Sequence, residues 1–399
     1  MNAKQTRYIY DILGGDDGRK LYDAVQKAID KAKTLGADII IGLGHLGVDP
    51  SSSPWTSEEV IANTTGFDAF IDGHSHTVME NKQVYDAAGK AVTLTQTGSY
   101  FANVGEMTIA ADGTITTKLI PTHEGMDAGI AAMQTGWVNT VDDMLGEKIA
   151  VGDSDFYVSD PATGKRRIRS AETNLGDFVA DGIYSYFNEV EQLHCDIAIM
   201  NGGGIRADEK AGYWTFKTCK QVSPFGNVAC LMSVTGKQIQ DALEFGARFV
   251  GPEGKENGGF LQVAGATYEI HTDIPNTVQT DEKNVWIGSA TGTPRVQNVK
   301  IYDKASGSYL PLDPGATYAL AGMNYTLRNL GDGFAMFDGA ELIKDYVSED
   351  YLVMSTYAMI FDAVNDMPVL SSANSPLASY PGYLLNYENP YGAGRIQVV

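Results

Sequence analysis

Residues 68–77 read DAFIDGHSHT, and this stretch decides how we interpret the rest of the chain. Residues 68–72 have the apolar character of a buried strand, and Gly73 then permits a sharp turn. The loop that follows carries two histidines, His74 and His76, one residue apart. Because imidazole is the commonest metal ligand in proteins, this loop is a candidate metal site.

A second apolar run lies upstream and also ends in a histidine. Residues 37–44 read ADIIIGLG and are followed by His45. Open α/β sheets bind ligands at the carboxyl ends of their strands, and two neighbouring strands that each release a histidine fit this rule. Each histidine alone is typical of a hydrogen-bonded loop residue, but the grouping between positions 45 and 76 favours a metal site.

Composition limits the possible function classes. The chain has 399 residues, 43% of them hydrophobic, which is enough for two or three packed domains. The net charge of -21 argues against a partner that is a nucleic acid polymer, because such binding needs a basic surface. Three cysteines are too few for a disulfide scaffold and are expected to be buried thiols. We expect no membrane span, and the first 17 residues lack the apolar core of a signal peptide.

Periodicity and turn residues predict an α/β first part. The elements that follow from these patterns are a helix over 21–35, a helix capped by Thr56 with Glu59 in the capping-box position, and strands over 92–97, 104–110 and 114–120, the last two joined as a hairpin. A helical pattern over 124–147 separates this part from a differently patterned remainder, so we expect an interdomain helix there.

The second part is expected to mix helices and strands. The predicted elements are helices over 174–187, from Thr235 and over 349–364, and strands over 196–200, 267–271, 296–302 and 394–399. The strand that ends at Met200 runs into Asn201-Gly-Gly-Gly-Ile-Arg206. Three glycines allow close backbone approach to a ligand, and arginine binds phosphate or carboxylate, although a simple glycine-rich turn with a surface arginine gives the same pattern.

Several short motifs occur in an order that resembles the secreted 5'-nucleotidase family, which includes UDP-sugar hydrolases. They are GHLGVD (44–49), IDGHSHT (71–77), ETNLGDFVAD (172–181), NGGGIR (201–206), PFGN (224–227), NY (324–325) and GDGF (331–334). The resemblance implies a fold that combines α/β and α+β parts: part of a four-layer metallophosphoesterase α/β sandwich, a linker helix and a mixed-sheet 5'-nucleotidase C-terminal domain. The expected boundaries are 1–123, 124–148 and 149–399.

The resemblance also implies a two-metal site for zinc, manganese, magnesium or calcium. His45 and His74 match metal ligands of the family, and His76 stands where the family has a further ligand. The Asp-x-His and Asn-His-Glu/Asp elements that open the family's metallophosphatase domain have no match in this sequence. We therefore expect an incomplete metal site, no catalytic histidine, and a chain that begins midway through that domain.

A set of residues in the second part resembles the family's nucleotide site: Lys165, Arg169, Asn201, Gly203, Arg206, Phe225, Tyr325 and Asp332. By this resemblance Arg169 and Arg206 bind phosphate, Phe225 stacks on one face of the base, and Asp332 contacts the ribose hydroxyls. Tyr325 is the candidate for the other face. Tyrosine replaces the family's phenylalanine there, and the spacing to Asp332 is one residue longer than expected. A buried core aromatic is the alternative for Phe225.

The resulting expectation is a 5'-nucleotidase-type hydrolase that keeps nucleotide recognition and loses most hydrolysis. Its partners would be a nucleoside 5'-monophosphate, a nucleoside or a UDP-sugar, and its location would be periplasmic, cell-surface or extracellular. A non-catalytic nucleotide-binding or adhesion module is the alternative from another class. A 2',3'-cyclic nucleotide phosphodiesterase with 3'-nucleotidase activity is the near neighbour within the enzyme class.

Overall fold

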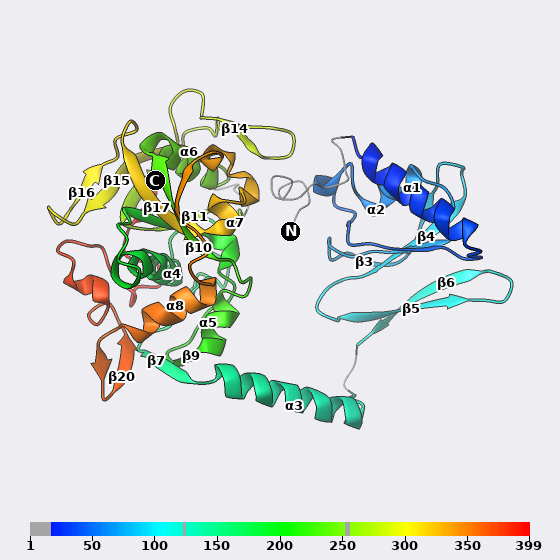
Figure 1. The fold of residues 1–399 in the computed structure, drawn as a ribbon, viewed down its shortest axis with the longest axis horizontal. Coiled ribbons are helices and arrows are strands. Elements are labelled where there is room, and N and C mark those ends of the chain that lie inside the picture. The colour runs from blue at the N-terminus through cyan, green and yellow to red at the C-terminus, as the bar shows by residue number, and fades with distance from the viewer. Residues whose placement is uncertain (1–16, 123–124, 252–255) are drawn as a thin grey trace. The chain divides into compact units, whose positions relative to one another are not determined.

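The structure, a computed structural model, describes residues 17–122, 125–251 and 256–399. The chain divides into two compact units, residues 1–131 (unit 1) and 132–399 (unit 2) (Figure 1). The stretch at the start of the chain in which we expected no signal peptide lies almost entirely outside the described residues. No helix among the described residues is long and apolar enough to cross a membrane.

Unit 1 is built on a four-stranded sheet of mixed direction with the order β1-β2-β4-β3. The first three of these strands are parallel, and β3 is antiparallel to β4. The elements are α1 (Arg19–Thr34), β1 (Ile41–Leu43), η1 (Pro50–Ser52), α2 (Ser57–Ala62), β2 (Ala69–Ile71), β3 (Val78–Tyr85) and β4 (Ala91–Thr97). The sequence pattern missed β3, because its residues are mostly exposed and show no clear alternation.

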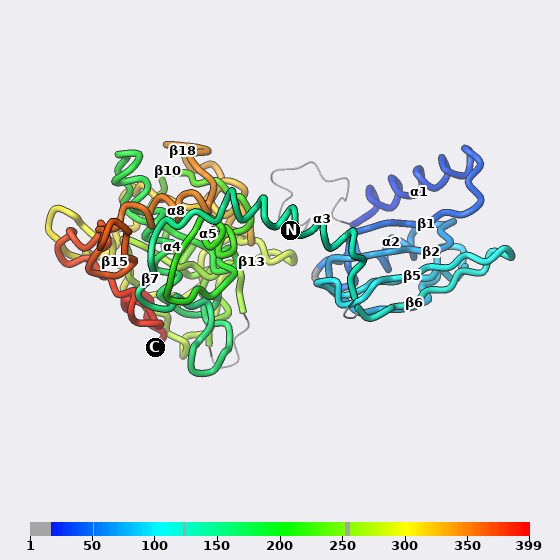
Figure 2. The backbone as a smooth tube through the Cα atoms, turned by 90° about the horizontal axis from the view of Figure 1, so that it is seen from below, coloured from blue at the N-terminus to red at the C-terminus, as the bar shows by residue number. Residues whose placement is uncertain are grey.

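The local patterns of unit 1 are otherwise confirmed. Thr56 and Glu59 form the expected capping box at α2. Strands β5 (Asn103–Ile109) and β6 (Ile115–Pro121) form a separate antiparallel hairpin, which Figure 2 shows as two strands side by side. The core of the unit is small, and apolar side chains of α1, α2, β2 and β4 supply most of it.

Helix α3 (Ala128–Leu145) occupies the region where the interdomain helix is predicted. The predicted start at residue 124 lies outside the described residues, and the helix ends two residues before 147. None of its residues is buried, and its apolar side chains, including Met133 and Trp137, are exposed.

Unit 2 is organised around a five-stranded sheet with the order β11-β8-β17-β10-β18. The bounds are β8 (Ile197–Asn201), β10 (Ala229–Thr235), β11 (Leu261–Ala264), β17 (Thr317–Met323) and β18 (Glu341–Lys344). Side chains of a strand point alternately to opposite faces. In β8, Ala198 and Met200 belong to one hydrophobic core, while Ile197 and Ile199 belong to the other. Both faces of the sheet are therefore covered.

Helices α4 (Asn174–Ser185) and α8 (Asp350–Met359) cover one face, and α6 (Gly236–Gly246) covers the other (Figure 1). The remaining helical elements are η2 (Tyr186–Val190), η3 (Gly202–Gly204), α5 (Phe216–Val222), α7 (Asn324–Leu327), η4 (Gly331–Gly333), η5 (Ala335–Phe337) and η6 (Pro376–Ser379). Thr235 and Gln238 form a capping box at α6, as the sequence predicts.

Three smaller sheets complete unit 2, with the orders β16-β15-β12-β21, β19-β20-β7-β9 and β13-β14. Their strands are β7 (Lys148–Gly152), β9 (Gly212–Thr215), β12 (Ala266–Ile270), β13 (Gln279–Thr280), β14 (Trp286–Gly288), β15 (Val296–Asp303), β16 (Ser308–Pro311), β19 (Ala363–Val364), β20 (Met367–Leu370) and β21 (Ile396–Val398). The three cysteines are buried free thiols, as predicted.

The predicted final helix over 349–364 is too long. Helix α8 ends at Met359, and residues 363 and 364 form β19 instead. Asn365 and Asp366 have φ values of 53° and 64°, so they form a tight turn that joins β19 to β20. Taken together, the two units form a mixed α/β fold with several mixed sheets, which confirms the predicted fold class.

Candidate functional site

One edge of the central sheet of unit 2 collects most of the predicted site residues. Strands β8 and β17 are parallel, so Asn201 at the end of β8 and Tyr325 just after β17 come to the same edge. Strand β10 is antiparallel to β17, with Ala229 opposite Met323, so the loop before β10 that contains Phe225 reaches this edge too. The sheet topology therefore brings together residues far apart in sequence.

Three side chains at this edge, those of Asn201, Tyr325 and Asp332, form a hydrogen-bonded group. The Tyr325 hydroxyl donates to Oδ1 of Asp332 at 3.0 Å, and Nδ2 of Asn201 donates to Oδ2 of the same carboxylate at 3.4 Å. Thr326 contributes a further bond from its hydroxyl to Oδ1 of Asn201 at 3.5 Å. Both oxygens of Asp332 therefore have protein partners, and the sequence prediction did not anticipate the bond from Tyr325.

Glycines make this packing possible. A Cβ added to Gly203 would lie 3.1 Å from the carbonyl oxygen of Gly258, which is a tight contact, whereas one on Gly258 would meet Oδ2 of Asp332 at an ordinary 3.8 Å. A Cβ on Gly331 would lie 2.5 Å from Cζ of Tyr325, so the tyrosine ring rests directly against the glycine backbone. Gly203, which was predicted for close approach to a ligand, closely approaches another loop of the protein in this structure.

Asp332 is held in an unusual environment. Its backbone lies in the left-handed region, with φ 55° and ψ 9°. Burial raises the pKa of its carboxyl, while the hydrogen bond from Tyr325 and the positive charges of Arg248 and Arg169 act in the opposite direction. The carboxylate therefore lies where an incoming hydroxyl group would be a favourable donor.

Arg206 and Phe225 lie together at the more open side of the site. The guanidinium carbon of Arg206 lies 5.6 Å from the centre of the Phe225 ring, and its Nη1 donates to the carbonyl oxygen of Gly203 at 3.3 Å. Phe225 is 57% exposed. An exposed phenylalanine is not a core residue, so the structure contradicts the alternative in which Phe225 packs in the core.

Arg169 reaches the same region from the loop before α4. Its Nη1 lies 3.7 Å from Oε2 of Glu256, and its buried Nε has no hydrogen-bond partner. Burial lowers the pKa of its guanidinium, and the nearby Arg166 and Arg206 lower this pKa further. A buried donor without a partner is costly, so an anionic ligand would be a favourable addition here.

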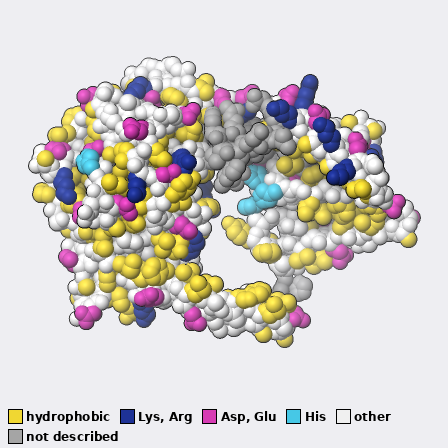
Figure 3. Space-filling model, viewed as in Figure 1, with side chains coloured by type: hydrophobic (Ala, Val, Ile, Leu, Met, Phe, Trp, Pro, Cys, Tyr) yellow, Lys and Arg dark blue, Asp and Glu magenta, His cyan; other side chains and the backbone are white. Residues whose placement is uncertain are grey.

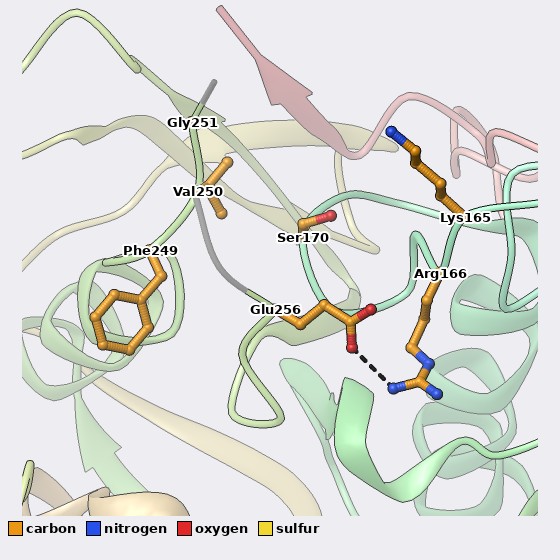
Figure 4. A pocket seen from close by; sticks show the side chains of 7 residues that line it. All are labelled: Lys165, Arg166, Ser170, Phe249, Val250, Gly251 and Glu256. Atoms are coloured by element: carbon orange, nitrogen blue, oxygen red, sulfur yellow. Dashed lines mark hydrogen bonds and ion pairs between the residues drawn. The ribbon is translucent and has the colours of Figure 1, made fainter. Parts of the chain in front are cut away.

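Lys165 belongs to a neighbouring pocket of about 340 Å³, where Arg166 and Glu256 form an ion pair at 2.8 Å (Figure 4). The pocket is lined by Lys165, Arg166, Ser170, Phe249, Val250, Gly251 and Glu256. It connects to the Asp332 group only indirectly, because Glu256 also contacts Arg169. The structure thus does not place Lys165 among the other predicted site residues.

Arg248 and Gly258 are site residues that the sequence analysis missed. Arg248 is buried, its guanidinium carbon lies 3.7 Å from the Phe245 ring centre, and its Nη1 donates to the carbonyl oxygen of Phe245 at 2.6 Å. The Gly258-Gly259 pair before β11 was a usable sign of close backbone approach. Nothing in the local sequence marks Arg248, since its role depends on a residue more than 80 positions away.

The predicted metal ligands lie in unit 1, where Figure 3 shows histidine side chains gathered on the surface. The ring centres of His45 and His74 are 5.2 Å apart. His76 lies 6.3 Å from the Tyr100 ring, measured between ring centres. Both His74 and His76 have positive φ values, 75° and 55°. The structure thus brings two of the three histidines into contact.

Asp72, which directly precedes the loop of His74, supports the loop that carries His45. Its buried carboxylate accepts hydrogen bonds from the backbone amides of Leu46 at 2.9 Å and Gly47 at 3.0 Å. Burial lowers the pKa of His74, as does its neighbour His45. Within the described ranges, no group of three or more His, Cys, Asp or Glu side chains is arranged to hold a metal ion. These residues alone do not fit the two-metal centre, and we derive no chemical step through it.

Each comparison with known proteins finds proteins that act on nucleotides. Residues 148–339 match the model of the 5'-nucleotidase C-terminal domain. The chain is 30% identical over 341 residues to the trifunctional nucleotide phosphoesterase protein YfkN of Bacillus subtilis, covering 82% of this chain and 21% of that protein. It is 27% identical over 400 residues to the mouse 5'-nucleotidase, covering 91% of this chain and 64% of the enzyme. The chain thus spans less than two thirds of these relatives.

A solved structure has a related fold. The crystal structure of a 5'-nucleotidase precursor from Thermus thermophilus aligns with a TM-score of 0.55 and 24% identity. The alignment covers 95% of this chain and 67% of that one. At this level of identity the likeness concerns the fold alone.

Proposed function

Residues 148–339 match the 5'-nucleotidase C-terminal domain, and from this premise we propose that the chain belongs to the 5'-nucleotidase family and that unit 2 recognises nucleoside 5'-phosphates. One observation carries the proposal. Segments around Asn201, Gly258 and Tyr325 meet around the half-buried Asp332 at one edge of the central sheet, and the loop that contains Phe225 reaches the same edge.

In this proposal the base lies against Phe225. The ring is 57% exposed, and Arg206 contacts it. Stacking on an aromatic ring contributes about 1 to 3 kcal/mol per base and accepts any base. Asp332 is the acceptor for the ribose hydroxyls, since its carboxylate already accepts hydrogen bonds from neutral donors.

The phosphate would lie between Arg169 and Arg206. The positive charge of Arg169 lowers the pKa of Asp332, and that of Arg206 lowers the pKa of Arg169, so the three groups are electrostatic neighbours. In a protein with a net charge of -21, an anionic substrate needs such a local cationic site. The unpartnered Nε of Arg169 supplies a donor that the phosphate would satisfy.

We further propose that the reaction in which this chain takes part is hydrolysis of a phosphoric ester with divalent metal ions. His45, His74 and His76 would supply some of the ligands of the metal site, which these residues alone do not complete. In this scheme residues 1–123 form part of a metallophosphatase domain, 124–148 the linker helix and 149–399 the recognition domain. A location in the periplasm, at the cell surface or outside the cell would follow from the family resemblance.

Isothermal titration of adenosine and AMP into the full chain, without added metal, tests the recognition step. We expect both to bind and AMP to bind more tightly, because only AMP carries the phosphate. Phe225→Ala should weaken both ligands by about 1 to 3 kcal/mol, the value of one stack.

Tyr213→Ala is the matched control. Tyr213 is 59% exposed and lies in β9 of the same unit, so the variant also removes an exposed aromatic side chain. The control should bind both ligands like the unmodified chain. If neither ligand binds, or if both alanine variants behave alike, the proposed site is wrong.

A further inference from the structure

The hydroxyl of Tyr325 is hydrogen-bonded to the carboxylate of Asp332, which in the proposed function accepts the ribose hydroxyls. It donates to Oδ1 of Asp332 at 3.0 Å, and Asn201 approaches Oδ2. Gly258 lies next to both oxygens, since a Cβ built on it would be 3.8 Å from one and 4.0 Å from the other. Each oxygen of the carboxylate therefore already has one donor from the protein, and a ribose hydroxyl would have to join or replace it.

The position of Tyr325 is fixed from two sides. Three atoms of its ring would lie within 2.6 Å of a Cβ on Gly331, so the ring lies on the bare glycine backbone, and its hydroxyl is held by Asp332. Burial and the adjacent carboxylate raise the pKa of the Tyr325 hydroxyl, which keeps it protonated and able to donate. The bond is thus a built-in partner for Asp332 when no ligand is bound.

A binding site discriminates against a substrate that lacks a hydroxyl group when binding of that substrate leaves a polar atom of the site without a hydrogen-bond partner. A site built to hydrogen-bond a substrate hydroxyl rejects the analogue without it because a buried polar atom is then left without a partner. In this chain the Tyr325 hydroxyl can remain on Asp332 when the sugar has no hydroxyl to offer. The analogue therefore leaves no unpaired oxygen behind.

We propose that Tyr325 is a specificity-determining residue that substitutes for the sugar hydroxyls at Asp332, so that the site accepts nucleosides with and without these hydroxyls. The inference rests on the proposed nucleoside site and names its substrate class more closely: nucleosides of ribose and of deoxygenated ribose. Phenylalanine at this position would keep the ring and lose the substitute donor.

Titration of adenosine and of 2',3'-dideoxyadenosine into the full chain and into Tyr325→Phe measures this effect. The quantity is the ratio of the two dissociation constants. We expect the unmodified chain to bind the two ligands within about threefold of each other, and Tyr325→Phe to raise the preference for adenosine by about fivefold or more, because dideoxyadenosine then buries an unpaired carboxylate oxygen.

Tyr318→Phe is the control. The Tyr318 hydroxyl accepts a hydrogen bond from the backbone amide of Asp313, and Tyr318 lies in β17, the strand that leads to Tyr325. Its ratio should match that of the unmodified chain. A merely structural role of Tyr325 would weaken both ligands by the same factor and leave the ratio unchanged, and this result would overturn the inference. A lower preference for adenosine in Tyr325→Phe would overturn it as well.

The two proposals fail in different ways. If the ligands bind and Phe225→Ala weakens them while the ratio is unaffected by Tyr325→Phe, the nucleoside site stands and the role of Tyr325 is wrong. If neither nucleoside binds to the unmodified chain, the proposed function is wrong, and the inference about Tyr325 is wrong with it.

Discussion

The two units differ in how they hold their candidate functional residues. In unit 2 the side chains bond to one another: Asn201 and Tyr325 both donate to Asp332. In unit 1 the histidines His45 and His74 meet through their rings, and the hydrogen bonds of Asp72 go to the backbone of the loop that follows β1. The first arrangement fixes side chains, and the second fixes a loop.

The hydrophobic cores of the two units differ in size. Unit 2 packs its central sheet between two large hydrophobic cores, and one of them encloses a buried ion pair between Arg395 and Asp181. Unit 1 has one small core. We conclude that a site formed by side chains from distant segments depends on a large, rigid core, whereas a strand-end loop needs only local support.

The largest expected effect comes from the buried network of unit 2. Asp181 accepts hydrogen bonds from Tyr383 and Tyr387 and pairs with the fully buried Arg395 at 2.8 Å. Asp181→Ala leaves this arginine without its closest counter-ion, which costs about 3 to 5 kcal/mol. Denaturant unfolding followed by near-ultraviolet circular dichroism should show the loss.

Glu58→Ala is the matched control in unit 1. Glu58 pairs with Lys82 at 2.6 Å, but both side chains are partly exposed. Surface pairs contribute about 0 to 1 kcal/mol, so the unfolding midpoint should hardly move. Equal losses in the two variants would contradict the difference between the cores.

The next effect concerns the arginines of the unit 2 site. Arg206→Gln removes a charged donor from the proposed phosphate position, and hydrogen bonds to charged groups contribute about 1.5 to 3 kcal/mol. The advantage of AMP over adenosine in isothermal titration should fall by this amount. Because Arg206 also contacts Phe225, the result is expressed as the ratio of the dissociation constants of adenosine and AMP. A change in base stacking affects both ligands equally and cancels in this ratio. Lys165→Gln, which removes a charge from the neighbouring pocket, should leave the ratio nearly unchanged.

The sequence was sufficient for what is determined locally. The capping boxes at Thr56 and Thr235 were predicted because they depend on residues three positions apart. The end of α8 was missed, although Asn365-Asp366 is a typical sequence for a tight hairpin turn. The apolar pattern of the helix continues past Ile360, so periodicity predicted a longer helix. The structure instead follows the turn residues.

The contents of the site were only partly predictable. The motifs named Asn201, Phe225 and Asp332. The parallel pairing of β8 with β17 brings Asn201 to the same edge as the segment that contains Asp332, and the antiparallel pairing of β10 with β17 brings the Phe225 loop there. The bond between Tyr325 and Asp332 could not be predicted, because it depends on the course of the chain between them. The buried position of Arg248 is likewise a result of tertiary packing.

A smaller effect is expected in unit 1. Asp72→Ala removes the acceptor for the backbone amides of Leu46 and Gly47, and a buried donor without a partner costs about 1 to 3 kcal/mol. Hydrogen exchange should therefore accelerate in residues 41–47, while the peptides of unit 2 keep their protection. Adenosine binding should not change. Faster exchange in both units would contradict the view that Asp72 stabilises only the loop after β1 in unit 1.

The smallest effect is a shift in the pH dependence of adenosine binding. Burial raises the pKa of Asp332, so on acidification its carboxylate is protonated, and adenosine affinity falls, at a higher pH than for an ordinary aspartate. The charge of Arg248 opposes this rise. Arg248→Met therefore raises the pKa further and moves the loss of affinity to higher pH, whereas Arg328→Met, which removes an arginine paired with Asp345 instead, leaves the profile in place. Identical profiles for all three proteins would show that Asp332 does not act as the acceptor for the sugar, and the proposed ribose position in unit 2 would have to be abandoned.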